Sequence, residues 1–321
     1  MAEFRPISVA TDMAIEARDI VRGEAHEEVP GVRVDKQKDR HVDVTRVEVF
    51  NSQGARLMGK PQGHYVTLDV PGFKDREAGL RADLVDVLTD ELKALIPEDT
   101  RKSILVVGLG NWNATPDALG PRVVERLLVT RHLSELVPPE IQERMRPVAA
   151  VAPGVLGTTG IETLDMIKGI VSEAHPDLVI AVDALAARSL DRLLGSVQIA
   201  DTGIHPGSGV GNKRQGLSHE SVGVPVTAIG VCTVVQAMSI AQEALRLLVQ
   251  QLADDAKFYK ILEEMGEPNQ NALIEEVLGE RLGGLMVTPK EIDLLINDMA
   301  DVLAESLNRA LQPQLDRSEW A

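Results

Sequence analysis

LVVGLGNWNATPD, at residues 105–117, has the pattern of a buried strand that leads into a tight polar turn and then an acid. A short, continuous apolar run is typical of a parallel strand that is covered on both faces. The glycines that follow let the backbone turn without a steric penalty. LVIAVD, at residues 178–183, is a second such run and ends directly on a carboxylate. Asp117 and Asp183 are therefore predicted beyond the carboxyl ends of strands, where open α/β sheets bind their ligands.

These two acids are the candidate catalytic residues. Acids at the ends of successive strands suit acid and base chemistry, because their environments can hold them in different protonation states. A structural role is the alternative, since an acid near a helix start complements the helix dipole and caps unpaired N–H groups. The residues by themselves leave both interpretations open.

Strand and helix patterns alternate along the middle of the chain, as they do in a parallel sheet with helices on both faces. We expect strands near residues 103–108, 148–152, 178–183, 196–201 and 225–231, and helices near residues 117–134, 161–174 and 235–252. Upstream, residues 42–50 and 64–70 predict a hairpin or sheet edge, and apolar spacing predicts a helix over 80–95. The capping-box spacing of Thr288 and Glu291 predicts the start of a last helix.

The composition favours a globular protein in a reducing compartment. The 321 residues are 44% hydrophobic but only 2% aromatic, so the core must be built from aliphatic side chains. A net charge of −16 argues against direct binding to nucleic acid. The sequence lacks both the roughly 18-residue apolar run of a membrane helix and a secretory signal, and its single cysteine, Cys232, forms no internal disulfide. We therefore expect a cytoplasmic protein without membrane contact, in which Cys232 is a buried, inert thiol.

The remaining chemical signals favour substrate contacts over a cofactor. Residues 108–113 lack the third glycine of a dinucleotide fingerprint, and residues 207–214 lack the ending of a phosphate-binding Walker loop. His205, Lys213 and Arg214 are candidate substrate-binding residues, and the two cations suit an acidic substrate. His205 could instead complete a metal shell with the two aspartates, but the chain has no compact metal motif. We expect neither a resident metal nor a cofactor.

Three long blocks resemble the germination proteases of spore-forming bacteria, endopeptidases that degrade small acid-soluble spore proteins. The blocks are GLGNWNATPDALGP at residues 108–121, PGVLGTTGIET at residues 153–163 and DTGIHPGSGVGNKR at residues 201–214. Blocks of this length are more specific than a short motif, and the resemblance extends over nearly the whole chain. Cys232 is a departure, because proline is expected there in the family.

This resemblance implies a phosphorylase/hydrolase-like α/β fold related to that of hydrogenase maturation proteases, with a mostly parallel or mixed sheet and helices on both faces. It also implies a homotetramer, a location in the forespore and spore core, and small acid-soluble spore proteins as substrates. The two aspartates implicated in the family correspond to Asp117 and Asp183 here. In the related maturation proteases, acids at these places bind a metal, so a metal-assisted variant with His205 as a third ligand stays open.

The resemblance also implies a zymogen. TDMAIE, at residues 11–16, resembles the Thr/Ser-Glu-apolar-Ala-x-Glu pattern that these proteases cut in their substrates. We predict that residues 1–12 form a propeptide, removed by cleavage between Asp12 and Met13. A helix cap at this position is the alternative, and both can hold together.

The predicted domain organisation then follows. Residues 13–321 should form a single α/β protease domain with a loop and helical extension near residues 258–311. Two functions compete with the endopeptidase. One is a nucleoside phosphorylase-like enzyme acting on small molecules, and the other is a binding protein whose aspartates only cap helices.

Overall fold

The computed structural model describes residues 11–25, 28–133, 136–204, 215–252, 274, 276–279, 281–282 and 284–315. The predicted substrate-binding residues His205, Lys213 and Arg214 lie outside these ranges. The same holds for residues 1–10 of the predicted propeptide and for most of the first half of the predicted extension at 258–311.

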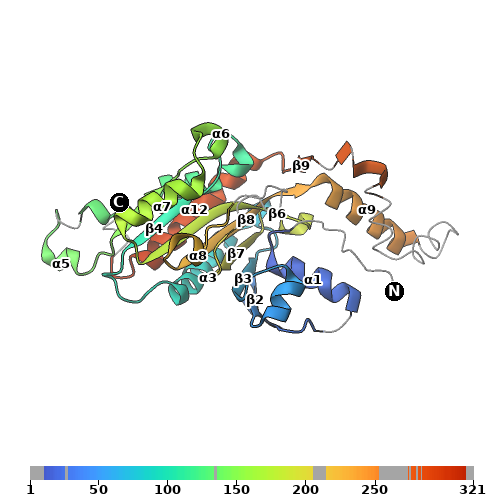
Figure 1. The fold of residues 1–321 in the computed structure, drawn as a ribbon. Helices are drawn as coiled ribbons and strands as arrows, with labels where there is room; N and C mark the ends of the chain where they lie inside the picture. The colour runs from blue at the N-terminus through green and yellow to red at the C-terminus, as the bar shows by residue number, and fades with distance from the viewer. Residues whose placement is uncertain are drawn as a thin grey trace.

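A nine-stranded mixed sheet forms the centre of the molecule (Figure 1). Its order is β1-β2-β3-β7-β8-β6-β4-β5, with β9 paired to β8 off this path. The strands β5, β4, β6 and β8 run parallel to one another, whereas β1, β2, β3 and β7 are joined antiparallel. The strands are β1 (Val32–Asp39), β2 (Val42–Val49), β3 (Gly63–Asp69), β4 (Ile104–Gly108), β5 (Val148–Val151), β6 (Leu178–Ala187), β7 (Ser196–Ala200), β8 (Val226–Gln236) and β9 (Met286–Val287).

Helices cover both faces of this sheet. They are α1 (Ala14–Ala25), α2 (Ser52–Met58), α3 (Leu80–Leu95), α4 (Leu119–Glu125), α5 (Pro139–Gln142), α6 (Leu156–Thr159), α7 (Thr163–Ala174), α8 (His219–Val222), α9 (Ala237–Leu252) and α12 (Ile292–Leu311). Short 3-10 turns occur at η1 (Phe73–Asp75), η2 (Thr115–Asp117), η3 (Arg131–Leu133) and η4 (Leu190–Arg192). The expected α/β class with a mixed sheet and helices on both faces is therefore confirmed.

Successive side chains of a strand point to opposite faces of the sheet, which explains why helices pack on both faces. Val106 of β4 packs with apolar residues of α3, α4 and α12, whereas its neighbours Leu105 and Val107 pack with residues of α7. Every residue of β4 is buried, as the unbroken apolar run predicted. A further apolar cluster joins the start of α1 to β2, β3, β6 and β8.

Two helix predictions were wrong at their boundaries. The helix expected over 117–134 is only α4, because the chain after Glu125 finds other partners: the Leu128 N–H donates to Asn308 Oδ1 of α12 (2.9 Å) and the Thr130 N–H donates to the β5 carbonyl of Val148 (3.0 Å). The last helix begins at Ile292 and not at Thr288, whose hydroxyl donates to the carbonyl of Thr233 on β8 (3.0 Å). In both places hydrogen bonds to a distant element replace the helix or helix-cap hydrogen bonds that the sequence predicted.

The other predicted elements agree with the structure, whereas β1 and β9 were not predicted. Strands β4, β5 and β7 lie within a residue of their predicted bounds, while β6 and β8 continue past theirs to Ala187 and Gln236. The expected hairpin is the β2–β3 pair, although its connection contains the unpredicted helix α2. Within the described part of the chain, no helix is both long enough and apolar enough to cross a lipid bilayer.

Candidate functional site

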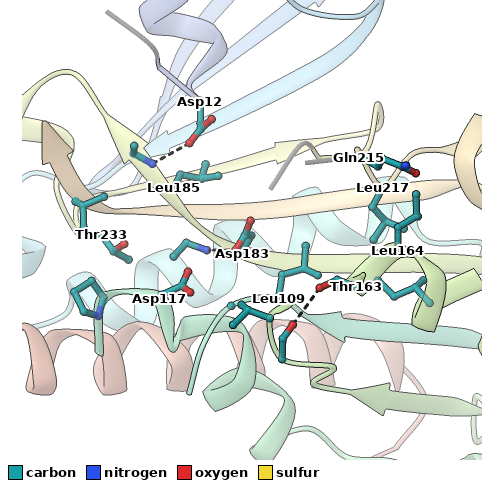
Figure 2. A pocket seen from close by; sticks show the side chains of 18 of the residues that line it. Asp12, Leu109, Asp117, Thr163, Leu164, Asp183, Leu185, Gln215, Leu217 and Thr233 are labelled. Carbon is teal, nitrogen blue, oxygen red and sulfur yellow. Dashed lines mark hydrogen bonds between the residues drawn. The ribbon is translucent and has the colours of Figure 1, made fainter. Parts of the chain in front are cut away.

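A pocket of about 260 Å³ lies at the carboxyl ends of β4 and β6, and both predicted catalytic acids line it (Figure 2). Asp117 comes from η2 and is partly exposed. Asp183 is only 5% exposed and lies inside β6, not beyond its end as predicted, because the strand continues to Ala187 in its pairing with β8. Apolar side chains form much of the remaining wall, among them Leu109, Val155, Leu164, Ile167, Leu185, Leu217, Val234 and Met286. The site is thus a small pocket of polar and apolar residues that contains both predicted acids, and a further acid, Glu162, lines it as well.

The turn after β4 fixes the position of Asp117. The Asn111 N–H donates to the Asp117 carboxylate (Oδ2, 2.8 Å) and to its backbone carbonyl (3.1 Å). Gly110 has φ of +118°, and a Cβ there would overlap the Asp117 carbonyl oxygen. Only glycine allows this approach without strain, which explains why the polar turn contains Gly110 at this point.

Asp183 is held against the same turn by close packing of backbone. Its Oδ1 accepts from the Ala184 N–H (2.9 Å), and the Leu109 N–H donates to the neighbouring Val182 carbonyl (2.8 Å). A Cβ at Gly120, in α4, would overlap Leu109 and lie 2.6 Å from the Val182 oxygen. The glycine therefore lets α4 sit directly on the ends of β4 and β6, which keeps the two acids near one another.

The predicted cleavage residue Asp12 lies in this pocket as well, a position that the sequence did not indicate (Figure 2). Its N–H donates to the Ala186 carbonyl (3.3 Å), and its Oδ2 accepts from the Ala186 N–H (3.0 Å). The chain just before α1 therefore pairs with the far end of β6. A segment that is remote in sequence thus lines the same pocket as the two aspartates.

The residues after Asp12 are held firmly. Met13, Ala14 and Ile15 are at most 2% exposed and pack in the apolar cluster under α1. The Glu16 carboxylate accepts from the N–H groups of Arg188 (2.9 Å) and Ser189 (3.1 Å). Its further partners are the Thr11 hydroxyl and the Arg192 guanidinium, the latter at 3.6 Å. The helix-start interpretation also holds, since α1 begins at Ala14.

Thr233 is a pocket residue that sequence reasoning missed. The register between β6 and β8 shifts after the Leu185–Cys232 pair, so Ala186 pairs with Val234 and Thr233 is skipped. Its buried hydroxyl lines the pocket and has no hydrogen-bond partner among the residues that the structure describes. A β-bulge of this kind re-aims a side chain, here into the pocket, but leaves no signature in the sequence.

The described residues contain no cluster of three or more His, Cys, Asp or Glu side chains arranged to hold a metal ion. His205, the third ligand of the metal-assisted alternative, lies outside them. Cys232 is fully buried, as predicted, and burial raises the pKa of its thiol well above the ordinary value. It lies beside the site, because its strand partner is Leu185 of the pocket wall.

Comparison with known proteins gives a consistent result. The sequence model of the germination protease family matches residues 8–260 and 252–321. The germination protease of Caldanaerobacter subterraneus subsp. tengcongensis is 46% identical over 317 residues, which cover 98% of this chain and 97% of the relative. Those of Clostridium perfringens (strain ATCC 13124) and Bacillus velezensis are 44% and 43% identical, cover 96% of this chain each, and are themselves covered to 96% and 95%. These near-complete matches favour the endopeptidase over both alternative functions, and the chain belongs to the germination protease family.

Proposed function

We propose that this protease of spore germination cuts small acid-soluble spore proteins and uses Asp117 and Asp183 as an acid–base pair. The observation that carries the proposal is the single pocket lined by both carboxylates and by Asp12. Family membership supports peptide hydrolysis as the reaction. The identity of the acids and of the substrate is our proposal.

The chemistry follows from two carboxylates in one pocket. Neighbouring carboxylates resist carrying two negative charges together, so one retains a proton more readily than the other. The ionised group takes a proton from water, which attacks the peptide carbonyl carbon, and the protonated group donates to the leaving amine. The apolar residues in the pocket wall lower the local polarity, which strengthens these charge interactions.

Residues 1–12 are proposed to be a propeptide that is removed by cleavage between Asp12 and Met13. Asp12 already lies in the pocket with the two acids, which supports cleavage at this bond. Its removal would empty part of the pocket for another peptide. Mildly acidic, dehydrating conditions should promote the cut, because they neutralise part of the mutual repulsion in a chain of net charge −16.

The loop 205–214 is proposed to contact acidic substrates through His205, Lys213 and Arg214. The described residues next to this segment support the assignment, because Gln215 and Leu217 line the pocket. The protein is further proposed to act as a homotetramer in the forespore and spore core.

Substitution of the two acids tests the proposal. Asp117→Asn and Asp183→Asn keep the side-chain shape but remove the ability to accept a proton, so each should slow cleavage of a small acid-soluble spore protein at least about 100-fold. The double variant should lose little more than the slower single variant, since the two groups act as one unit. Fragment mass spectrometry over time gives the rates, and circular dichroism checks the fold.

Asp90→Asn is a matched control, because Asp90 is 70% exposed on α3 and lies outside the pocket. It should cleave at the wild-type rate. All of these proteins are assayed without residues 1–12, so that the proposed propeptide does not occupy the pocket. Near-normal cleavage by Asp117→Asn or Asp183→Asn would falsify the two-aspartate mechanism, while absence of cleavage by the truncated wild type would contradict the proposed substrate.

A further inference from the structure

The carbonyl oxygen of Asp12 has two side-chain donors that the aspartate pair does not explain. The Lys60 ammonium lies 2.8 Å from it, and the amide nitrogen of Gln198 lies 3.2 Å from it. This oxygen belongs to the peptide bond between Asp12 and Met13. Two polar side chains, from different parts of the fold, therefore converge on one carbonyl.

The side-chain amide of Gln198 makes hydrogen bonds to the backbone on either side of Met13. While its Nε2 donates to the Asp12 carbonyl, its Oε1 accepts from the Ala14 N–H at 2.7 Å. Gln198 is in the middle of β7 and only 8% exposed, so the sheet fixes its backbone. The Gln198 amide thus fixes the Asp12 carbonyl, which is part of the peptide bond to Met13, and the N–H of Ala14.

Lys60 is placed by a helix end. It follows α2 directly after Gly59, which closes the helix with φ of +60°, and its N–H donates to the Ala55 carbonyl (3.3 Å). Its ammonium also reaches the Thr11 carbonyl at 3.3 Å. Burial lowers the pKa of Lys60, while the charges of Asp12 and Glu16 act to raise it. The cation is thus a partly dehydrated charge with acids beside it, and its effect on a nearby oxygen is stronger than in water.

The two sets of groups meet at Asp12. Asp117 and Asp183 line one pocket, and Lys60 and Gln198 line a second pocket of about 60 Å³. Asp12 lines both. The carbonyl oxygen is therefore bound from the second pocket, while the acids that would activate water lie in the first.

We propose that Lys60 and Gln198 form the oxyanion hole for cleavage of the peptide bond between Asp12 and Met13; this rests on the proposed function. When water adds to the carbonyl carbon, the C=O electron pair moves onto the oxygen that both side chains already contact. One aspartate takes a proton from the water. The tetrahedral species then collapses, the C–N bond breaks, and a proton passes to the Met13 nitrogen, so that water is consumed and a carboxylic acid and an amine are formed. Fixed donors stabilise the developing negative charge without reorganising.

The test follows release of the 12-residue fragment from the full chain under mildly acidic conditions. Lys60→Met and Gln198→Glu should each lower the first-order rate about 100-fold or more, since loss of one oxyanion donor typically costs that much. Lys60→Arg keeps a cationic donor and should retain more of the rate than Lys60→Met. Gln198→Glu keeps the acceptor for the Ala14 N–H but brings negative charge to the oxyanion.

Hydrogen exchange at the Ala14 amide distinguishes a catalytic role of Lys60 from a role in positioning the segment around Asp12. In Lys60→Met, Gln198 still binds that N–H, so its protection should match the wild type although cleavage is slow. Protection that falls in parallel with the rate would show that Lys60 only seats the segment, and it would overturn the proposal. Matched controls are Lys93→Met and Gln53→Glu, both at exposed positions away from the two pockets, which should cleave normally.

Comparison with Asp183→Asn distinguishes the two proposals. If Asp183→Asn is inactive while Lys60→Met or Gln198→Glu cleaves at the wild-type rate, the oxyanion hole is wrong and the aspartate pair stands. If the wild type releases no fragment ending at Asp12, the proposed propeptide step is wrong, and the oxyanion hole is overturned with it. Should Lys60→Met fail to fold, Lys60→Arg and Gln198→Glu decide the outcome by the same criteria.

Discussion

Cys232 is a fully buried thiol on β8, packed in the same apolar cluster as Met13. Burial in this cluster disfavours the thiolate, which raises the pKa of Cys232, with the charges of Glu16 and Asp12 acting in the same direction. Because the thiolate is the reactive form, the side chain is chemically inert in the folded protein. Because the pKa of Cys232 is higher in the folded protein than in the unfolded chain, the free energy of unfolding should depend on pH.

An unfolded cysteine ionises near pH 8.5, whereas the folded thiol stays neutral. Since the folded pKa is the higher one, its stabilising effect is fully present below pH 8.5 and is lost as the pH rises above that value. Between pH 7.5 and pH 9.5 the wild type should therefore lose about 1.4 kcal/mol more unfolding free energy than Cys232→Ala. Urea unfolding at the two pH values measures this difference, and equal losses in both proteins would contradict it.

At the scale of elements, α4 and the turns beside it decide where the two proposed catalytic acids lie. Gly120 allows α4 to approach the backbone of Leu109 and Val182, and the same approach holds η2 near β6. The short length of α4 has the same origin, because the following residues bond to α12 and β5. Local helix propensity was outweighed by these contacts.

Gly120→Ala should therefore lower both stability and activity. The added methyl group has no room against backbone atoms, so we expect a loss of about 1–3 kcal/mol and a shift of α4 that separates the two acids. Chemical denaturation and the rate of substrate cleavage measure the two effects.

Gly169→Ala provides the matched control, since Gly169 is inside α7 and a Cβ there meets open space. That change should raise stability by about 0.5–1 kcal/mol and leave cleavage unchanged. A tolerated Gly120→Ala variant would show that the packing of α4 on the strand ends does not control the site.

At the scale of the whole molecule, α9 and β9 form one of the exposed apolar regions among the described residues. Figure 1 shows α9 extending beyond the end of the sheet, away from α3, α7 and α12. Its Leu247 and Leu248 are 43% and 46% exposed, and the exposed Leu285 and Met286 lie at β9. Exposed apolar surface of this kind is typical of a contact between subunits, so we place part of the proposed tetramer interface here.

The double substitution Leu247→Asp/Leu248→Asp should shift the protein from tetramer to smaller species, because carboxylates would have to be buried in the interface. Light scattering coupled to gel filtration measures the mass. Leu57→Asp, on α2 with 44% exposure, should leave the assembly intact. A wild type that is monomeric, or a double variant that stays tetrameric, would contradict the prediction that α9 lies in the interface.

The sequence by itself determined the order of the main strands and helices, two candidate acids that share a pocket, and the family. Unbroken apolar runs such as Leu105–Val107 encode strands covered on both faces, and the acids that follow them are placed at one sheet edge by parallel pairing. These are local signals, since burial and turn formation depend on neighbouring residues. For that reason Asp117 and Asp183 could be predicted as candidate site residues without a structure.

Only the tertiary structure brought Asp12, Lys60 and Gln198 together. Asp12 and Gln198 are 186 residues apart, and their contact depends on the order β3-β7-β8 within the sheet and on the place where α1 packs. The bulge that turns Thr233 into the pocket depends likewise on the register between β6 and β8. No periodicity in the sequence carries this information, because such contacts arise when separate elements are packed against one another and not from the preferences of any one segment.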